Sequence, residues 1–209
     1  MTNLRAWTLG ALLVAALAPG VAAADGAGPR AVVQKVSDDT LAVLGDKSLS
    51  ADAKRARVEQ IVYAAADFDT LSKLVLARSW GTFTPEQQAQ FVAEFKRHLS
   101  VTYGKNVENY NNEKVAIIGD REEARGDWTV TTKILRGGGA DDVLLDYRLR
   151  QKDGQWKIID FVIEHVSLVA NFRSQFQDVL GQGGDGPARV IKLLHEKNER
   201  GEPLKTDKS

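Results

Sequence analysis

The sequence has no cysteine among its 209 residues, so disulfide bonds and thiolate metal sites are excluded. It also lacks an excess of charge of either sign, with 28 basic and 28 acidic residues. Proteins that bind nucleic acids are usually basic, and this balance does not favour that class. The histidines, His98, His165 and His195, are scattered without the spacing of metal ligands, so no metal site is predicted. The length suits one domain with a sizeable core.

An apolar run at the N-terminus, from Ala6 to Ala18, follows a single positive charge at Arg5. The run is too short to span a bilayer, and Pro19-Gly20 interrupts it. Ala22-Ala23-Ala24 then matches the small residues that signal peptidase requires. We therefore expect a signal peptide over residues 1–24, cleaved near Ala24, with an uncleaved anchor as the alternative. The exported chain should form a single domain over residues 25–195, followed by a polar, disordered tail over residues 196–209.

Helical periodicity dominates the first half of the chain. Apolar residues at a spacing of three and four predict helices over residues 30–44 and 51–63, and Asp67 or Asp69 would cap a third. The clearest start is Thr84-Pro85-Glu86-Gln87, which combines an N-cap, a first-turn proline and a capping box. We expect this helix to reach about Tyr110, with one apolar stripe along its length.

Strand periodicity takes over after Glu113. Segments 115–118, 124–135, 143–150 and 156–164 read as four strands, joined by Gly137-Gly138-Gly139 and Lys152-Asp153-Gly154 among short connections. The last strand is apolar on both faces, which is typical of a strand covered on both sides. Ser167 should cap a helix that ends at Gly181, and Gly186-Pro187 opens another. Helices, then an antiparallel meander, then helices predict an α+β fold.

The second half also carries a family resemblance. Tyr147, Trp156-Lys157 and Asp160, followed by the run from Val166 to Phe176, resemble the MlaC-type, or toluene-tolerance, periplasmic phospholipid-binding proteins. The resemblance implies a curved four-stranded antiparallel sheet, like the nuclear-transport-factor cone, packed with a helical lobe around an apolar cavity. It implies a periplasmic carrier that is not an enzyme, with bound phospholipid as ligand and no cofactor. The implied partners are an inner-membrane ABC transporter complex and an outer-membrane lipoprotein complex, and the implied state is a monomer.

The resemblance also turns the apolar stripes into candidates for a lipid cavity. Without it, the same side chains would be read as an ordinary core. The candidate lining residues are Leu74, Trp80, Phe91, Phe95, Leu99, Tyr103, Val130, Ile134, Leu145, Tyr147, Phe161, Ile163, Val166, Val169 and Phe172.

Two charged residues, Asp160 and Arg173, each have two possible roles. Asp160, among apolar neighbours, is either a structural carboxylate or a functional acid. In the second case it would be the base of a cone-fold enzyme or of a binder of small hydrophobic molecules. Arg173 meets either a lipid phosphate or an acid such as Asp160, and we favour the structural pair. Glu164, His165 and Ser167 are too close together in sequence to form a hydrolase triad. A relative that handles hopanoid- or sterol-type lipids is a further alternative.

Overall fold

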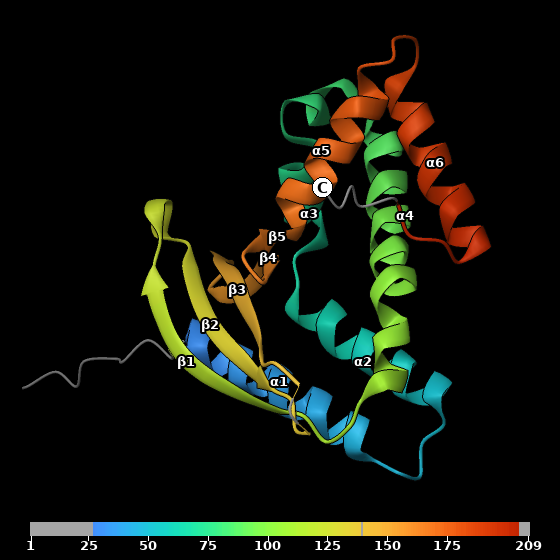
Figure 1. Cartoon of the computed structure of the whole chain (residues 1–209). Helices are drawn as coiled ribbons and strands as arrows, with labels where there is room; N and C mark the ends of the chain where they lie inside the picture. Colours follow the sequence, from blue (N-terminus) through green and yellow to red (C-terminus); the bar gives the residue numbers. More distant parts are fainter. Residues whose placement is uncertain (1–26, 139, 205–209) are drawn as a thin grey trace, which may run out of the picture.

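The computed structural model describes residues 27–138 and 140–204, so the expected signal peptide lies outside the described residues. Within them, six α-helices accompany one five-stranded antiparallel sheet (Figure 1). The helices are α1 (Pro29–Gly45), α2 (Ala51–Ala65), α3 (Phe68–Leu76), α4 (Pro85–Tyr103), α5 (Leu168–Leu180) and α6 (Gly186–Arg200). The strands are β1 (Lys114–Glu122), β2 (Trp128–Leu135), β3 (Val143–Lys152), β4 (Gln155–Ile163) and β5 (Val166–Ser167). In this described part, no helix has both the length and the apolar character needed to cross a membrane.

Local signals set most helix starts. The hydroxyl of Thr84 accepts from the N–H of Gln87, whose side chain accepts from the N–H of Thr84, so the predicted capping box is present. Asp67 caps α3 through the N–H of Thr70, and Ser167 caps α5 through the N–H of Ala170. These side chains supply acceptors for N–H groups that have no partner within the helix.

The prediction of four strands is wrong, because β5 adds a short fifth strand beside β4. The turn between them consists of Glu164 and His165, both with positive φ, of 45° and 67°. Neither residue is glycine, so the sequence carries no turn signal there. The second predicted strand also begins later than expected, at Trp128, because residues Ala124–Gly126 form a 3-10 turn.

The sheet bends around α1, as Figure 1 shows. Its register is interrupted within β1, between Ile117 and Gly119, and at Ile159 in β4. A bulge bends its strand and increases the local twist. The bulge at Ile159 also changes which side chains of β4 share a face of the sheet. Tyr147 and Leu149 lie on one face of β3, and they pair with Phe161 and Ile158 of β4. Ile158 and Phe161 therefore share the α1 face, although simple alternation along β4 would place them on opposite faces.

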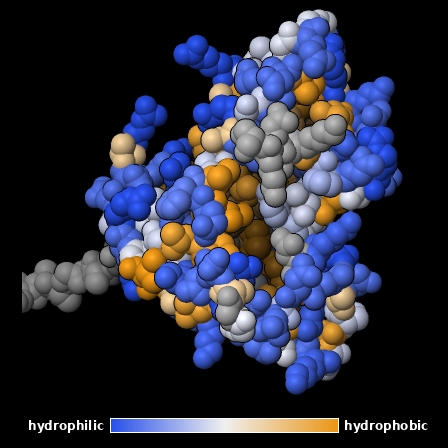
Figure 2. Space-filling view, viewed as in Figure 1, coloured by the Kyte–Doolittle hydropathy of each residue, from blue (hydrophilic) through white to orange (hydrophobic). Residues whose placement is uncertain are grey.

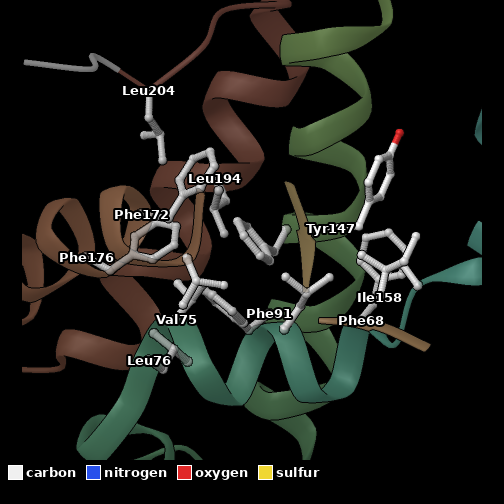
Figure 3. Packing of buried hydrophobic residues seen from close by; sticks show 14 of the residues in the cluster. Phe68, Val75, Leu76, Phe91, Tyr147, Ile158, Phe172, Phe176, Leu194 and Leu204 are labelled. Carbon is white, nitrogen blue, oxygen red and sulfur yellow. The ribbon is translucent and has the colours of Figure 1, made fainter. Parts of the chain in front are cut away.

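The core of the helical lobe consists of stacked phenylalanines between α4 and α5, with α3 and α6 around them (Figure 3). The Phe91 ring stacks on Phe95 at 5.5 Å between centroids, and Phe172 stacks on Phe176 at 6.0 Å. Edge contacts of 5.1–5.4 Å join the two pairs across the helices. This arrangement is a solid aromatic core with favourable ring geometry.

Two helix ends differ from the sequence predictions. The helix that begins at Pro85 ends at Tyr103, and a 3-10 helix, η2 (Gly104–Asn109), continues the chain. At the other end of the chain, α6 runs to Arg200, and Leu204 is buried beyond it. The expected disordered tail from residue 196 is therefore wrong for residues 196–204.

A buried histidine fastens this C-terminal segment to α4. The N–H of Leu204 donates to Nε2 of His98 at 3.2 Å, so the proton of the neutral ring lies on Nδ1. Nδ1 then donates to Oδ1 of Asn198 at 2.9 Å, and Asn198 donates to Glu94 at 2.7 Å. Burial lowers the pKa of His98, which favours this neutral form.

Candidate functional site: two apolar pockets between the sheet and the helices

Two adjoining pockets lie between the sheet and the helices. The space-filling view shows an apolar hollow between the sheet and α4 (Figure 2). We call the two parts the α4 pocket and the α1 pocket, each after the helix that closes it. They share four lining residues: Val58, Val62, Leu145 and Phe161. One wall of apolar side chains from α2, β3 and β4 therefore separates the two.

The α4 pocket has a volume of about 250 Å3. Besides the shared wall, its apolar lining comes from α2, α3, α4, η2, β4 and α5: Tyr63, Phe68, Leu99, Tyr103, Val107, Ile163 and Leu168. Its polar lining residues are Arg55, Glu59 and Ser100. The hydroxyl of Ser100 donates to the Glu59 carboxylate, and burial raises the pKa of the Tyr63 and Tyr103 hydroxyls. Both tyrosines are therefore neutral at neutral pH.

The α1 pocket has a volume of about 550 Å3. Its lining combines one face of α1 with three strands and the loop before β1: Val36, Ser37, Thr40, Leu41, Leu44, Asn109, Tyr110, Glu113, Val115, Ile134, Arg136, Val143 and Tyr147. Burial raises the pKa of Tyr147 to about 12, so this hydroxyl is also neutral. The α1 pocket is thus mainly apolar, with its charged residues at Glu113 and Arg136.

A larger hollow of about 970 Å3 lies on another side of α1 and α2. Its lining alternates small alanines with charged residues such as Lys35, Asp39 and Arg57, and it includes Trp156. It shares only Val36 with the α1 pocket. This outer groove also has apolar lining residues such as Val32, Val43 and Ile61, but it shares no residue with the α4 pocket and does not include the wall that joins the two inner pockets.

The structure divides the predicted cavity residues into two groups. Six line the two pockets and are half-buried: Leu99, Tyr103, Ile134, Leu145, Phe161 and Ile163; Tyr147 also lines the α1 pocket but is buried. Five others are fully packed in the core and line neither pocket: Phe91, Phe95, Val130, Val169 and Phe172. Leu74 and Trp80 pack against that core, and Val166 is 56% exposed beside the β4–β5 turn.

The sequence prediction missed the helical wall formed by α1, α2 and η2. The apolar spacing that predicts α1 and α2 includes Val36, Leu41, Val58 and Val62, and this spacing is the signal that marks them. Periodicity identified them as inward-facing residues, without distinguishing a core from a pocket. Val107 likewise continues the apolar stripe of α4 into η2.

Asp160 lies outside both pockets. It pairs with Arg148 in the β3–β4 register, and it is therefore on the sheet face opposite to Phe161. Its carboxylate accepts from the Ser167 hydroxyl at 2.5 Å and from the N–H of Val169 at 3.0 Å, and Arg148 lies 3.7 Å away. This carboxylate joins β4 to the first turn of α5, and it is not directed at a ligand in the pockets.

Arg173 does not pair with Asp160, so that expectation is wrong. Its Nε and Nη2 both donate to the carbonyl of Leu74, at 3.0 and 2.5 Å. The guanidinium thereby holds α5 against the end of α3. The two residues lie 99 positions apart in the sequence, so no local pattern indicates the contact.

The family model described as MlaC protein matches residues 34–196. Toluene tolerance protein ttg2D of Pseudomonas putida is 26% identical over 164 residues, covering 75% of this chain and 76% of that protein. The intermembrane phospholipid transport system binding protein MlaC of Haemophilus influenzae is 25% identical over 113 residues, covering 53% of each chain.

A solved structure extends the likeness to the fold. The phospholipid-binding protein from Ralstonia solanacearum, in complex with a phospholipid, superposes with a TM-score of 0.74 and 30% identity. The match covers 84% of this chain and 99% of that one. Sequence and fold therefore agree across most of the described residues, and the chain belongs to the MlaC family.

Proposed function

We propose that this protein is a phospholipid carrier that holds the acyl chains of one glycerophospholipid in the α1 and α4 pockets and releases the lipid unchanged. The observation that carries the proposal is the pair of adjoining apolar pockets that share Val58, Val62, Leu145 and Phe161. Membership of the MlaC family and the phospholipid held by the Ralstonia relative support it.

The energetics of acyl chains explain why such pockets are needed. Each methylene removed from water contributes about 0.8 kcal/mol, so two chains represent on the order of 20 kcal/mol. An apolar wall such as Leu145, Phe161 and Ile163 provides this burial without competing polar groups. The headgroup should stay at the rim in contact with water, because burying an unpaired phosphate is costly.

The finer features of the fold belong to the same proposal. We infer that the bent sheet forms a cone like that of nuclear transport factor, and that the two pockets join into one cavity when lipid enters. The half-buried state of the lining residues supports this, because a ligand would cover the surface that they still expose.

We also place the carrier in the periplasm, between an inner-membrane ABC transporter complex and an outer-membrane lipoprotein complex. The name of the Haemophilus relative, which includes an intermembrane phospholipid transport system, supports these partners. The apolar run before Ala24 supports export. The transfer involves no covalent step, and the engaged carboxylate of Asp160 offers no base to a ligand in the pockets.

Native mass spectrometry of protein expressed with its own N-terminus and released by osmotic shock tests the proposal. We expect a species that carries one phospholipid per chain, identified after lipid extraction, on a polypeptide that begins near Asp25. A polycyclic lipid in its place would instead indicate the hopanoid- or sterol-handling alternative. Protein that carries no lipid and takes none from phospholipid vesicles would refute the carrier.

A further inference from the structure

A basic pocket opens beside the α4 pocket, with a volume of about 530 Å3. Its charged lining consists of four basic residues and one acid: Arg55, Lys96, Arg97, Lys105 and Glu59. It shares four residues with the α4 pocket: Arg55, Glu59, Tyr63 and Ser100. An apolar pocket and a positively charged one thus meet along a common rim.

Arg55 stands on this rim, and its Nε donor is unused. Its Nη2 contacts Glu108 at 2.7 Å and its Nη1 contacts Asp52 at 3.2 Å. Its Nε is buried and has no hydrogen-bond partner among the described residues. A buried donor of a charged group is costly to leave unpaired, so this atom is suited to an acceptor that arrives with a ligand. Both acids that hold the guanidinium are more than half exposed, which leaves them free to yield to a stronger anion.

Two lysines add positive charge around this rim. Lys96 places its Nζ 3.8 Å from the centre of the Tyr63 ring, which fixes an ammonium above a pocket wall. Neither Lys96 nor Lys105 forms an ion pair within residues 27–138 and 140–204. Arg97 is paired with Glu199, so the unpaired charges of the pocket are the two ammonium groups, for which the described residues offer no ion-pair partner within 4 Å.

Gly104 packs against the aliphatic stem of Arg55 and so helps to position its guanidinium. A Cβ at this glycine would lie 3.1 Å from Cδ and 3.3 Å from Cγ of Arg55. The backbone of Gly104 has φ of −61°, a conformation that any residue can adopt, so glycine is not required here for backbone freedom. Its small size instead lets the stem of Arg55 lie against η2, at the rim that the two pockets share.

We propose that this rim is a binding site for the phosphodiester of the lipid, with Arg55 as the principal donor and Lys96 and Lys105 as supporting charges. The inference rests on the proposed carrier function, and it adds a headgroup site to the apolar pockets. Arginine suits the task because its planar fork matches phosphate oxygens and stays charged at every relevant pH. The carrier then distinguishes a phospholipid from an uncharged lipid with the same chains.

Three probes offered to lipid-stripped protein test this site: dioctanoyl phosphatidylglycerol, dioctanoylglycerol and inorganic phosphate, each titrated by calorimetry. Wild type should bind the phospholipid more tightly than the diacylglycerol. Arg55→Gln should weaken phospholipid binding about ten- to hundredfold, the loss expected for one charge-assisted hydrogen bond, and leave diacylglycerol binding unchanged. The matched control is Arg57→Gln, on the same helix but lining the outer groove, which should alter neither.

Two more variants guard against a folding defect. Gly104→Ala keeps every charge and displaces the stem of Arg55, so it should reduce the preference for phospholipid by a smaller factor. Lys105→Glu changes an exposed side chain and should weaken phospholipid binding at low salt. Thermal unfolding of each variant would report on folding.

The possible results separate the two proposals. Equal binding of phospholipid and diacylglycerol by wild type would overturn the headgroup site and leave the carrier intact. Saturation by inorganic phosphate alone, without any preference between the two lipids, would assign the rim to free phosphate and overturn the headgroup site. Binding of neither lipid would overturn both proposals.

Discussion

At the scale of single residues, Asp160 shows how one side chain joins the sheet to the helical lobe. It accepts hydrogen bonds from Ser167 and Val169 at the start of α5, and Arg148 lies beside it from β3. The carboxylate thus adds to the capping of α5, whose N-terminus favours negative charge. Its place on the sheet face opposite to the pockets explains why an acid is tolerated within an apolar strand.

Replacing Asp160 with Asn should therefore lower stability. The amide would present an NH2 group toward donors, and we expect the free energy of unfolding to fall by about 1–3 kcal/mol. Urea denaturation measures the change. Asp146→Asn, at a half-buried position of β3, is the matched control and should have a smaller effect. Unchanged stability of Asp160→Asn, together with complete loss of function, would favour the catalytic reading instead.

His98 should make the protein sensitive to acid. Burial lowers the pKa of His98 in the folded protein from its ordinary value of 6.5, so the unfolded chain takes up the proton first. The stability that this histidine contributes is present above about pH 6.5 and is lost as the pH falls below it. Protonation would also break the hydrogen bond from Leu204 to Nε2.

The contribution of His195 to the pH dependence of stability has the opposite sign, so it must be removed before that of His98 can be measured. Its hydrogen bond to Glu94 raises the pKa of His195, so its contribution is present at low pH and is lost as pH rises. In a His195→Gln background, urea denaturation between about pH 5 and 7.5 should show stability falling toward acid pH. Adding His98→Gln should flatten that profile. A slope that survives in the double variant would contradict the assignment to His98.

At the scale of elements, α2 is the least buried of the six α-helices in the described residues. None of its fifteen residues is fully buried, although Ile61 packs against the core. Val58 and Val62 belong to the wall that the two pockets share. Helices gain most of their stability from the packing of an apolar face, so α2 depends on whatever fills the pockets.

Amide hydrogen exchange should reveal this dependence. In lipid-free protein, the amides of α2 should exchange faster than those of α4, whose Phe91 and Phe95 lie in the solid core. Loading with phospholipid should slow exchange in α2 and leave the first half of α4 unchanged, which serves as the internal control. Uniform protection across both helices would mean that lipid stabilises the fold globally and does not complete the packing of α2.

Elements set by local chemistry were predictable from the sequence, and elements set by distant contacts were not. Thr84, Ser167 and Gly154 mark a capping box, a helix cap and a tight turn through their own side chains or backbone freedom. The bulge at Ile159 and the short β5 strand depend on how β4 meets its neighbours. Such features have no local composition signal, so the fifth strand was not predicted and simple alternation gives the wrong faces for β4.

The residues of the candidate site could likewise be predicted from the sequence only in part. Phe91, Phe95, Leu99 and Tyr103 share one stripe of α4, and periodicity gives them one role. In the structure, the first two lie in the solid core and the last two line the α4 pocket. The difference arises because α5 and α6 cover only part of α4, and the sequence of α4 does not contain that information.

At the scale of the whole molecule, the protein combines a solid helical lobe with a sheet whose inner face is only partly filled. The lobe gathers the fully buried phenylalanines, and the pockets lie where α1, α2, η2 and the C-terminal part of α4 face the sheet. A carrier needs both parts, because the solid core maintains the fold when the pockets are empty. Loss of lipid should then lower stability without unfolding the protein.

Two tryptophan substitutions on one sheet face test this division between core and cavity. Leu145 is half-buried and lines both pockets, whereas Val130 is fully buried and lines neither. Leu145→Trp should fill the cavity, so the lipid-free variant should melt near the wild-type temperature while recovery of phospholipid falls. Val130→Trp should overpack the core and lower the free energy of unfolding by about 1–3 kcal/mol, while its folded fraction keeps lipid. Calorimetry of lipid-free protein and quantitative lipid extraction measure the two effects. If Leu145→Trp lost as much stability as Val130→Trp and kept its lipid, the shared wall would be core, and the ligand would have to bind elsewhere.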